Sequence, residues 1–264
     1  MMERLKNFIS KAYIFIILLF LYAPIAVLIV SSFNDSKSRV VWGGFTLRWY
    51  RGVFESDQIM DALFTTMIIS LSASLIATVL GVMAAIGISA MKKRSYKAVM
   101  AVNNIPMVNA DIVIGISLML WFIKFMPLGF MSVLLAHITF DVPYVILSVM
   151  PKLQQMNVSV YEAARDLGAN AVYAFFKVVL PQLYGGILSG FFLAFTISMD
   201  DFVVTYFTKG AGVDTLSTLI YGELKKGIKP EMYALSTIIF ALVLIVLIVV
   251  NIYSGKEERA VIDH

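Results

Sequence analysis

Residues 159–168 read Ser-Val-Tyr-Glu-Ala-Ala-Arg-Asp-Leu-Gly, and residues 178–181 read Val-Val-Leu-Pro. Ser159 and Glu162 have the spacing of a capping box, which favours the start of a helix. Gly168 suits a left-handed helix stop, and Asn170 can cap a second short helix. This stretch therefore predicts a helix, a tight turn and another helix.

The composition around this stretch is that of an integral membrane protein. Hydrophobic residues make up 60% of the 264 residues, charged residues only 14%, and the mean hydropathy is +0.86. So much apolar surface excludes an ordinary soluble domain. The sequence contains no cysteine, which excludes disulfides and thiolate metal sites. The net charge of +4 comes from loops between apolar runs, so topology accounts for it better than nucleic-acid binding.

Apolar runs on both sides of the stretch are long enough to cross a bilayer, because a spanning helix needs about 20 apolar residues. We expect an all-α membrane protein in which residues 1–264 form one transmembrane domain. The loop 151–181 lies between the fourth and fifth runs. The predicted spans are 12–34, 62–91, 98–123, 131–150, 182–208 and 232–255.

Basic residues in the loops predict the orientation of these spans. The first run follows positive charges, as a signal peptide does, but it is too long and lacks a small-residue cleavage site, so we interpret it as a retained anchor. Lys92, Lys93, Arg94 and Lys97 crowd the turn between the second and third runs, which favours a cytoplasmic position for that turn. Six spans then put both termini in the cytoplasm.

Small residues recur at every fourth position in two of the runs. Such stripes let helix backbones approach closely in lipid, so they predict packing between helices. A role in lining a pore is the alternative. The stripes are Ala73, Ala77, Gly81, Ala85 and Ser89 in the second run, and Gly186, Gly190, Ala194 and Ser198 in the fifth.

Four acids interrupt the apolar runs, where an aspartate costs roughly 2.5 to 3.5 kcal/mol at the centre of a helix. They are Asp111, Asp141, Asp200 and Asp201, and no lysine or arginine lies at comparable depth. These carboxylates could pair with another subunit, be protonated, or face water and meet a cationic substrate.

Aromatic residues accompany these acids and favour the cationic substrate. Their rings could offer cation–π contacts or flank an alkyl chain, with lipid or core packing as the alternative. These residues are Phe140, Tyr144, Phe202 and Tyr206. Further aromatics in the expected outer loop 32–61 alternate with Arg48 and Arg51, which suits a helix at the membrane interface. This loop and 209–231 are candidate docking surfaces for an outer partner.

The loop 151–181 resembles the EAA loop of permease subunits in ATP-binding-cassette (ABC) importers. The pattern is Glu-Ala-Ala, three residues, Gly, nine residues, then Ile-x-Leu-Pro, and only Val178 departs from it. The resemblance implies a type I importer permease fold (MetI-like) whose loop forms coupling helices against an ATPase subunit. The implied contact residues are Glu162, Ala163, Ala164, Gly168, Leu180 and Pro181.

Four further segments narrow the resemblance to spermidine/putrescine permeases. They are Asn109-Ala-Asp111-Ile-Val, His137-Ile-Thr-Phe, Phe195-Thr-Ile-Ser-Met-Asp200-Asp201 and Trp42-Gly-Gly-Phe45-Thr-x-x-Trp49-Tyr50. The resemblance implies alternating access, a second permease subunit, two copies of a cytoplasmic ATPase and an extracytoplasmic polyamine-binding protein. The expected substrate pathway comprises Asp111, Asp200, Asp201, Phe202 and Tyr206, and on physical grounds Asp141.

The sequence lacks an ATP site of its own. Its nearest approach to a Walker A motif, Gly222 to Gly227, is followed by Ile228 rather than by Lys and Ser/Thr. We therefore expect no catalytic or metal site in this chain, with ATP and Mg on the partner ATPase.

Three alternatives remain open. The chain could be an ABC permease for another cationic or small solute. It could be an ion-coupled secondary transporter, although no convincing internal repeat is present. His137 and Asp141 share a helix face and could make a catalytic or metal pair, but a third ligand or nucleophile signature is missing.

Overall fold

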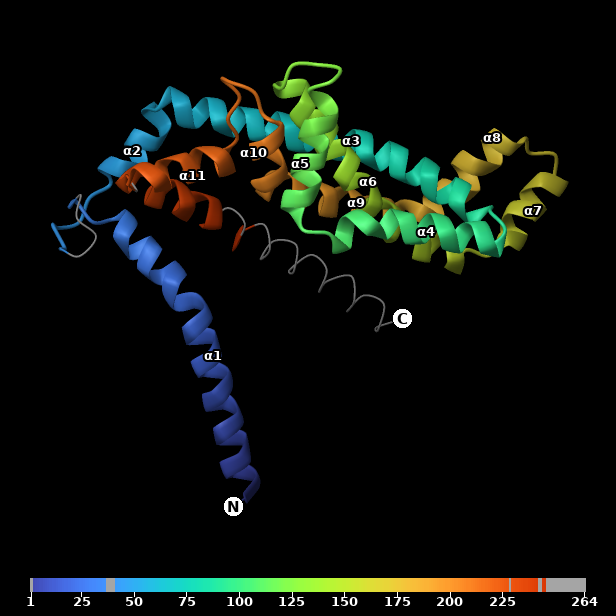
Figure 1. Ribbon diagram of the computed structural model, residues 1–264. Helices are drawn as coiled ribbons and strands as arrows, with labels where there is room; N and C mark the ends of the chain where they lie inside the picture. The colour runs from blue at the N-terminus through green and yellow to red at the C-terminus, as the bar shows by residue number, and fades with distance from the viewer. Residues whose placement is uncertain (1, 37–40, 228, 242–243, 246–264) are drawn as a thin grey trace. The chain divides into compact units, whose positions relative to one another are not determined.

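The computed structural model describes residues 2–36, 41–227, 229–241 and 244–245 (Figure 1). The described part of the chain is built from helices, with one isolated bridge between Asn34 and Phe45. It divides into two compact units: residues up to 60 with those from 220 onward, and residues 61–219.

Long apolar helices correspond to the first, second and fourth predicted spans. They are α1 (Met2–Ser32), α3 (Asp57–Ser89) and α6 (Phe130–Gln155). A fourth candidate span, Ala171–Asp200, contains α8 (Ala171–Ala174), the π-helix Phe175–Val179 and α9 (Leu180–Asp200). Residues 230–241 begin the last predicted span as a helix, and most of its remainder lies outside the described residues.

The third predicted span, 98–123, is not one straight helix. It consists of α4 (Lys93–Val108) and α5 (Asp111–Phe122), whose axes differ by 104°. Pro106 lies in the last turn of α4, and Asn109 and Ala110 then adopt extended backbone. A proline weakens the helix around it, so the chain can turn where apolar length alone predicts continuation.

The fifth predicted span, 182–208, is also interrupted. The helix α9 ends at Asp200, Asp201 is extended, and α10 (Val203–Thr208) begins after Phe202. The following loop leads to α11 (Leu216–Lys226). Both interruptions fall beside acids that the sequence placed within continuous helices.

The helices α6 and α9 pack closely along the small-residue stripe of α9. Gly186, Gly190, Ala194 and Ser198 are all buried. A Cβ atom on Gly190 would lie 3.3 Å from the Cα of Val145, so the two backbones are nearly in contact. The stripe on α3 is used in the same way, because a Cβ atom on Gly81 would lie 2.7 Å from the Cβ of Val145. The packing interpretation of the stripes is thus confirmed.

The segment between α6 and α9 forms the predicted helix, turn and helix. The first helix is α7 (Val158–Asp166), Gly168 has a φ of +90°, and Asn170 caps α8 by accepting a hydrogen bond from the Tyr173 amide at 2.7 Å. The predicted capping box is wrong, however. Asn157 caps α7 by accepting from the Ser159 amide at 3.0 Å, because the helix begins at Val158 and Ser159 already lies inside its first turn.

The loop after α1 is held by a small polar core around Asn34. Its side chain accepts from the Gly43 amide at 2.8 Å and donates to the Val41 carbonyl at 2.9 Å. Trp49 donates to the Asn34 carbonyl at 2.8 Å and is 5% exposed. The predicted interfacial helix is therefore shorter than the stretch of aromatic residues in this loop. The helix α2 covers only Arg48–Glu55, and it buries Trp49.

A buried acid organises α11 in the same unit. Glu223 is 4% exposed at its side chain and forms ion pairs with Lys229 at 3.0 Å and Lys226 at 3.3 Å. The hydrogen bond from Lys229 lowers the pKa of Glu223, and burial opposes this shift. The carboxylate thereby ties the end of α11 to the residues that follow it.

The α6–α9 contact predicts different outcomes for two adjacent glycines. A Cβ atom on Gly186 would lie 3.1 Å from the Ser148 carbonyl oxygen, whereas one on Gly185 would meet no atom within 4 Å. Gly186→Ala should lower the free energy of unfolding by about 1–3 kcal/mol through overpacking. Gly185→Ala, the matched control, should leave it unchanged or raise it by up to about 1 kcal/mol through helix propensity.

Thermal unfolding of the purified transporter in detergent measures both effects. Equal unfolding temperatures for the two variants would contradict the close approach of α6 and α9.

Candidate functional site

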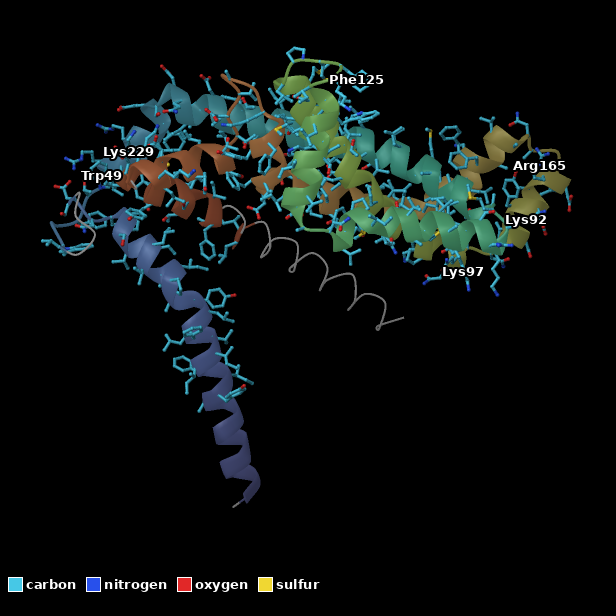
Figure 2. All side chains as sticks on the ribbon, in the orientation of Figure 1. Trp49, Lys92, Lys97, Phe125, Arg165 and Lys229 are labelled. Atoms are coloured by element: carbon cyan, nitrogen blue, oxygen red, sulfur yellow. The ribbon has the colours of Figure 1, made fainter. Side chains whose placement is uncertain are left out.

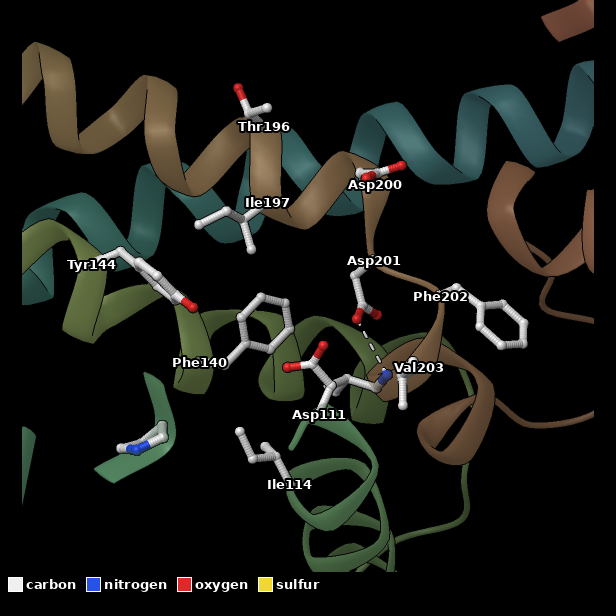
Figure 3. A pocket seen from close by; sticks show the side chains of 12 residues that line it. Asp111, Ile114, Phe140, Tyr144, Thr196, Ile197, Asp200, Asp201, Phe202 and Val203 are labelled. Atoms are coloured by element: carbon white, nitrogen blue, oxygen red, sulfur yellow. Dashed lines mark hydrogen bonds between the residues drawn. The ribbon is translucent and has the colours of Figure 1, made fainter. Parts of the chain in front are cut away.

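A pocket of about 420 Å³ lies within residues 61–219, where the two interrupted spans meet α6. Figure 3 shows side chains reaching it from α5, α6, α9 and the segment between α9 and α10. Its lining consists of Pro106, Asp111, Ile114, Phe140, Tyr144, Thr196, Ile197, Asp200, Asp201, Phe202, Val203 and Val204. Three of the four predicted acids are thus brought together.

The turn between α4 and α5 places Asp111 at the pocket. Asp111 is the first residue of α5 and is exposed. A carboxylate in the first turn is stabilised by the helix dipole, so the kink supplies a favourable position for a charged acid. In a straight helix the same residue would sit among intrahelical hydrogen bonds instead of at a helix start.

Asp201 has a structural task at the interruption of the fifth span. Its carboxylate accepts hydrogen bonds from the amide of Val204 at 3.2 Å and from the amide and hydroxyl of Thr205 at 2.7 and 2.8 Å. These amides belong to the first turn of α10 and would otherwise lack partners. Figure 3 shows Asp201 extending from the interruption toward the side of the pocket that carries Asp111 and Phe140.

Asp200, its neighbour, is the last residue of α9 and is exposed. Neither Asp200 nor Asp111 forms an ion pair with another described residue. The two adjacent acids of the fifth span therefore differ: Asp201 caps a helix, whereas Asp200 is an exposed lining residue of the pocket.

Asp141 does not line the pocket. Its side chain is 0% exposed, and neither carboxylate oxygen has a hydrogen-bond partner among the described residues. Burial without donors favours the uncharged acid, because an isolated charge in an apolar interior is very costly. The sequence reveals that an acid lies in this span, but the packing of α6 decides which way it faces.

The remaining predicted residues are distributed between the pocket and the opposite end of this unit. Phe202 lines the pocket, whereas Tyr206 stacks at a tilt against Phe202 with ring centroids 5.4 Å apart and lies outside the lining. Phe140 and Tyr144 line it as expected from their position beside the acids. Pro106 and Thr196 were not predicted from the sequence as lining residues. Pro106 could have been found, because a proline near several asparagines indicates a break in a helix.

The predicted coupling residues lie together on the segment that contains α7 and α8, seen at the right of Figures 1 and 2. Glu162 and Ala163 are exposed on α7, Ala164 is half-buried, and Gly168 occupies the turn. Leu180 and Pro181 begin α9 directly after the π-helix. The segment exposes apolar side chains as well, including Leu167 at 90% and Val172 at 66%.

The chemistry of the pocket is acidic and aromatic. The described lining residues include three aspartates and three aromatic residues and no lysine, arginine or histidine. Such a lining repels anions and favours a cation that carries apolar groups. Several described helices are apolar and long enough to span a bilayer, and residues 61–219 enclose an acidic pocket, a combination typical of a multi-pass membrane permease.

Comparison with known proteins agrees with this class. Residues 77–256 match the family described as binding-protein-dependent transport system inner membrane component. The chain is 35% identical over 255 residues to the spermidine/putrescine transport system permease protein PotC of Haemophilus influenzae, covering 96% of this chain and 99% of that one. It is 36% identical over 248 residues to the putrescine transport system permease protein PotI of Escherichia coli, covering 91% and 88%.

Solved structures show the same fold at low sequence identity. A bacterial ABC transporter involved in alginate import gives a TM-score of 0.71 at 16% identity, with 97% of this chain and 96% of that chain covered. The methionine transporter MetNI gives 0.59 at 16% identity, with 73% and 94% covered. The chain belongs to the binding-protein-dependent transport permeases, the inner-membrane components of ABC importers. The expected type I importer fold and membrane location are thereby confirmed.

The position of Asp141 predicts a mild effect of removing its charge. Asp141→Asn should leave the amount of assembled transporter and the uptake rate within about twofold of wild type, because no described donor stabilises a charge at this buried side chain and the amide has the same size. Uptake by cells at matched membrane levels checks this expectation. A large loss of uptake with normal assembly would instead show that Asp141 ionises during transport.

Proposed function

We propose that this chain is a pore subunit of an ABC importer for polyamines of the spermidine/putrescine class. The observation that carries the proposal is the pocket in which Asp111 and Asp200 are exposed among aromatic residues without a basic residue in the described lining. The names of the relatives support the same substrate class. Polyamines present ammonium groups separated by methylene chains, which matches acids separated by rings.

Transport then follows from charge and alternating access. An ammonium group exchanges water for Asp111 and Asp200, while the methylene groups lie against Phe140, Tyr144 and Phe202. Asp201 contributes its remaining negative potential while it caps α10. The pocket is shared with water and binds its cargo weakly, because a conduit that held a polyamine tightly would not release it inward.

The same proposal assigns the partners. A second permease completes the pore, two copies of a cytoplasmic ATPase bind and hydrolyse ATP with Mg, and an extracytoplasmic binding protein delivers the polyamine. The α7–α8 segment is the ATPase contact, which places it and both termini in the cytoplasm. The aromatic loop around Trp42 and Phe45 is then on the outer side, where both side chains are exposed for the binding protein.

A second candidate cargo is another organic cation. The acidic and aromatic lining also suits other amines that carry apolar groups, and their competition with polyamine uptake tests this candidate.

Charge removal at the pocket is the principal test. Asp111→Asn and Asp200→Asn should each reduce uptake of radiolabelled spermidine or putrescine about tenfold or more, since a hydrogen bond to a charged group is worth roughly 1.5–3 kcal/mol. The measurement uses cells that express this chain with its neighbouring transporter subunits at matched membrane levels.

Asp111→Glu and Asp200→Glu are the matched controls, because they keep the charge. They should retain more uptake than the amides. Undiminished uptake in both amide variants would show that these acids are not part of the substrate pathway. Absence of polyamine uptake by wild-type cells would refute the substrate class.

Glu162 provides a test of the ATPase contact. Because Asn157 caps α7, the exposed carboxylate of Glu162 is not needed to start this helix. Glu162→Gln should leave the chain folded and lower ATP-dependent uptake and co-purification of the ATPase. Asn157→Ala is the contrasting variant, expected to weaken α7 by about 1 kcal/mol. Full assembly and full coupled transport in Glu162→Gln would refute the contact.

A further inference from the structure

A buried histidine joins the two halves of the interrupted fifth span. His137 lies on α6 and is 1% exposed. Its Nδ1 is 2.5 Å from the hydroxyl of Ser198 in the last turn of α9, and its Nε2 is 2.8 Å from the hydroxyl of Thr205 in α10. One side chain from a neighbouring helix therefore contacts the chain before and after the interruption.

The hydrogen-bond directions follow from the number of available protons. The Thr205 hydroxyl donates its only hydrogen to Asp201 at 2.8 Å, so it must accept from His137. The Nε2 atom then carries the proton, and in a neutral imidazole Nδ1 is an acceptor that receives the hydrogen of Ser198. The result is a directed chain from Ser198 through His137 and Thr205 to Asp201.

This series of hydrogen bonds fixes the orientation of Asp201. The carboxylate oxygen that accepts from the Thr205 hydroxyl also accepts from the Thr205 amide at 2.7 Å, and it lies 3.6 Å from His137 Nε2. Ser198 and Thr205 are 2% and 0% exposed, so water does not compete for these bonds. Cooperative buried networks of this kind are rigid when every member is satisfied.

We propose that His137 is a positioning residue that sets the angle of the interruption and thereby presents Asp200 and Asp201 to the cation in the pocket. The proposal rests on the proposed function of this pocket. His137 itself does not line the pocket, so it acts through Thr205 and Asp201. Its role differs from that of a metal or catalytic pair with Asp141, since both ring nitrogens are already bonded to hydroxyl groups.

Two substitutions separate the halves of the contact. The amide of Asn reaches the position of Nδ1 and can keep the bond to Ser198, whereas the amide of Gln reaches Nε2 and can donate to Thr205. In liposomes that contain the complete transporter, His137→Asn should lower the polyamine moved per ATP hydrolysed about fivefold or more, because small misplacements of binding groups are costly. His137→Gln should stay within about twofold of wild type.

A purely structural role predicts a different pattern. Both variants would then lower the amount of assembled transporter, with the transport-to-ATP ratio unchanged. If the histidine variants do not assemble, Thr205→Val carries the same test, because it removes the hydroxyl and keeps the shape. An unchanged ratio in Thr205→Val, or equal ratios in His137→Asn and His137→Gln, would overturn the proposal.

A labelling measurement makes the test independent of the cargo. The chain has no cysteine, so single Val203→Cys and Thr196→Cys reporters can be placed on the two sides of the interruption. Both positions line the pocket, the first on α10 and the second on α9. His137→Asn should change the rate at which a cationic thiol reagent labels Val203→Cys, and should leave Thr196→Cys unchanged.

Identical labelling in all backgrounds would refute the positioning role, whatever the substrate. Absence of polyamine uptake by wild type, combined with the expected labelling change, would refute the proposed function and retain the role of His137.

Discussion

A helix that is interrupted inside a bilayer frees backbone amides and carbonyls, and no lipid can satisfy them. This chain is interrupted twice beside its pocket, between α4 and α5 and between α9 and α10. Between α9 and α10, the carboxylate of Asp201 accepts hydrogen bonds from the amides of Val204 and Thr205. His137 connects both half-helices to α6. The pocket exists because these hydrogen bonds offset the energetic cost of the interruption.

The contact between α6 and α9 and the ends of the interrupted helices are held by different interactions. The α6–α9 contact is a close fit of glycines against backbone, which resists deformation. The ends of the interrupted helices are held by a few hydrogen bonds instead. At the other end of α9, a π-helix over Phe175–Val179 precedes Pro181, and its wider turn fits the missing amide of that proline. The helix α9 thus links the α7–α8 segment to the pocket.

Much of this fold could be predicted from the sequence, because apolar length is sufficient to locate α1, α3 and α6. The turn and the Asn170 cap between α7 and α8 follow equally from local chemistry. The two interruptions could not be located in this way, since hydropathy counts apolar residues and carries no information on direction. Pro106 and the paired acids were visible as residues, but their effect depends on partners such as His137. For the same reason the sequence predicted four pathway acids, whereas α6 turns Asp141 into the core.

The contrast between Asp200 and Asp201 has a consequence for how such transporters diversify. Asp201 has a structural role, since its carboxylate accepts three hydrogen bonds from α10. Asp200 carries no such obligation and can be exchanged without opening the helix behind it. The fold should therefore tolerate substitutions at Asp200 more readily than substitutions at Asp201.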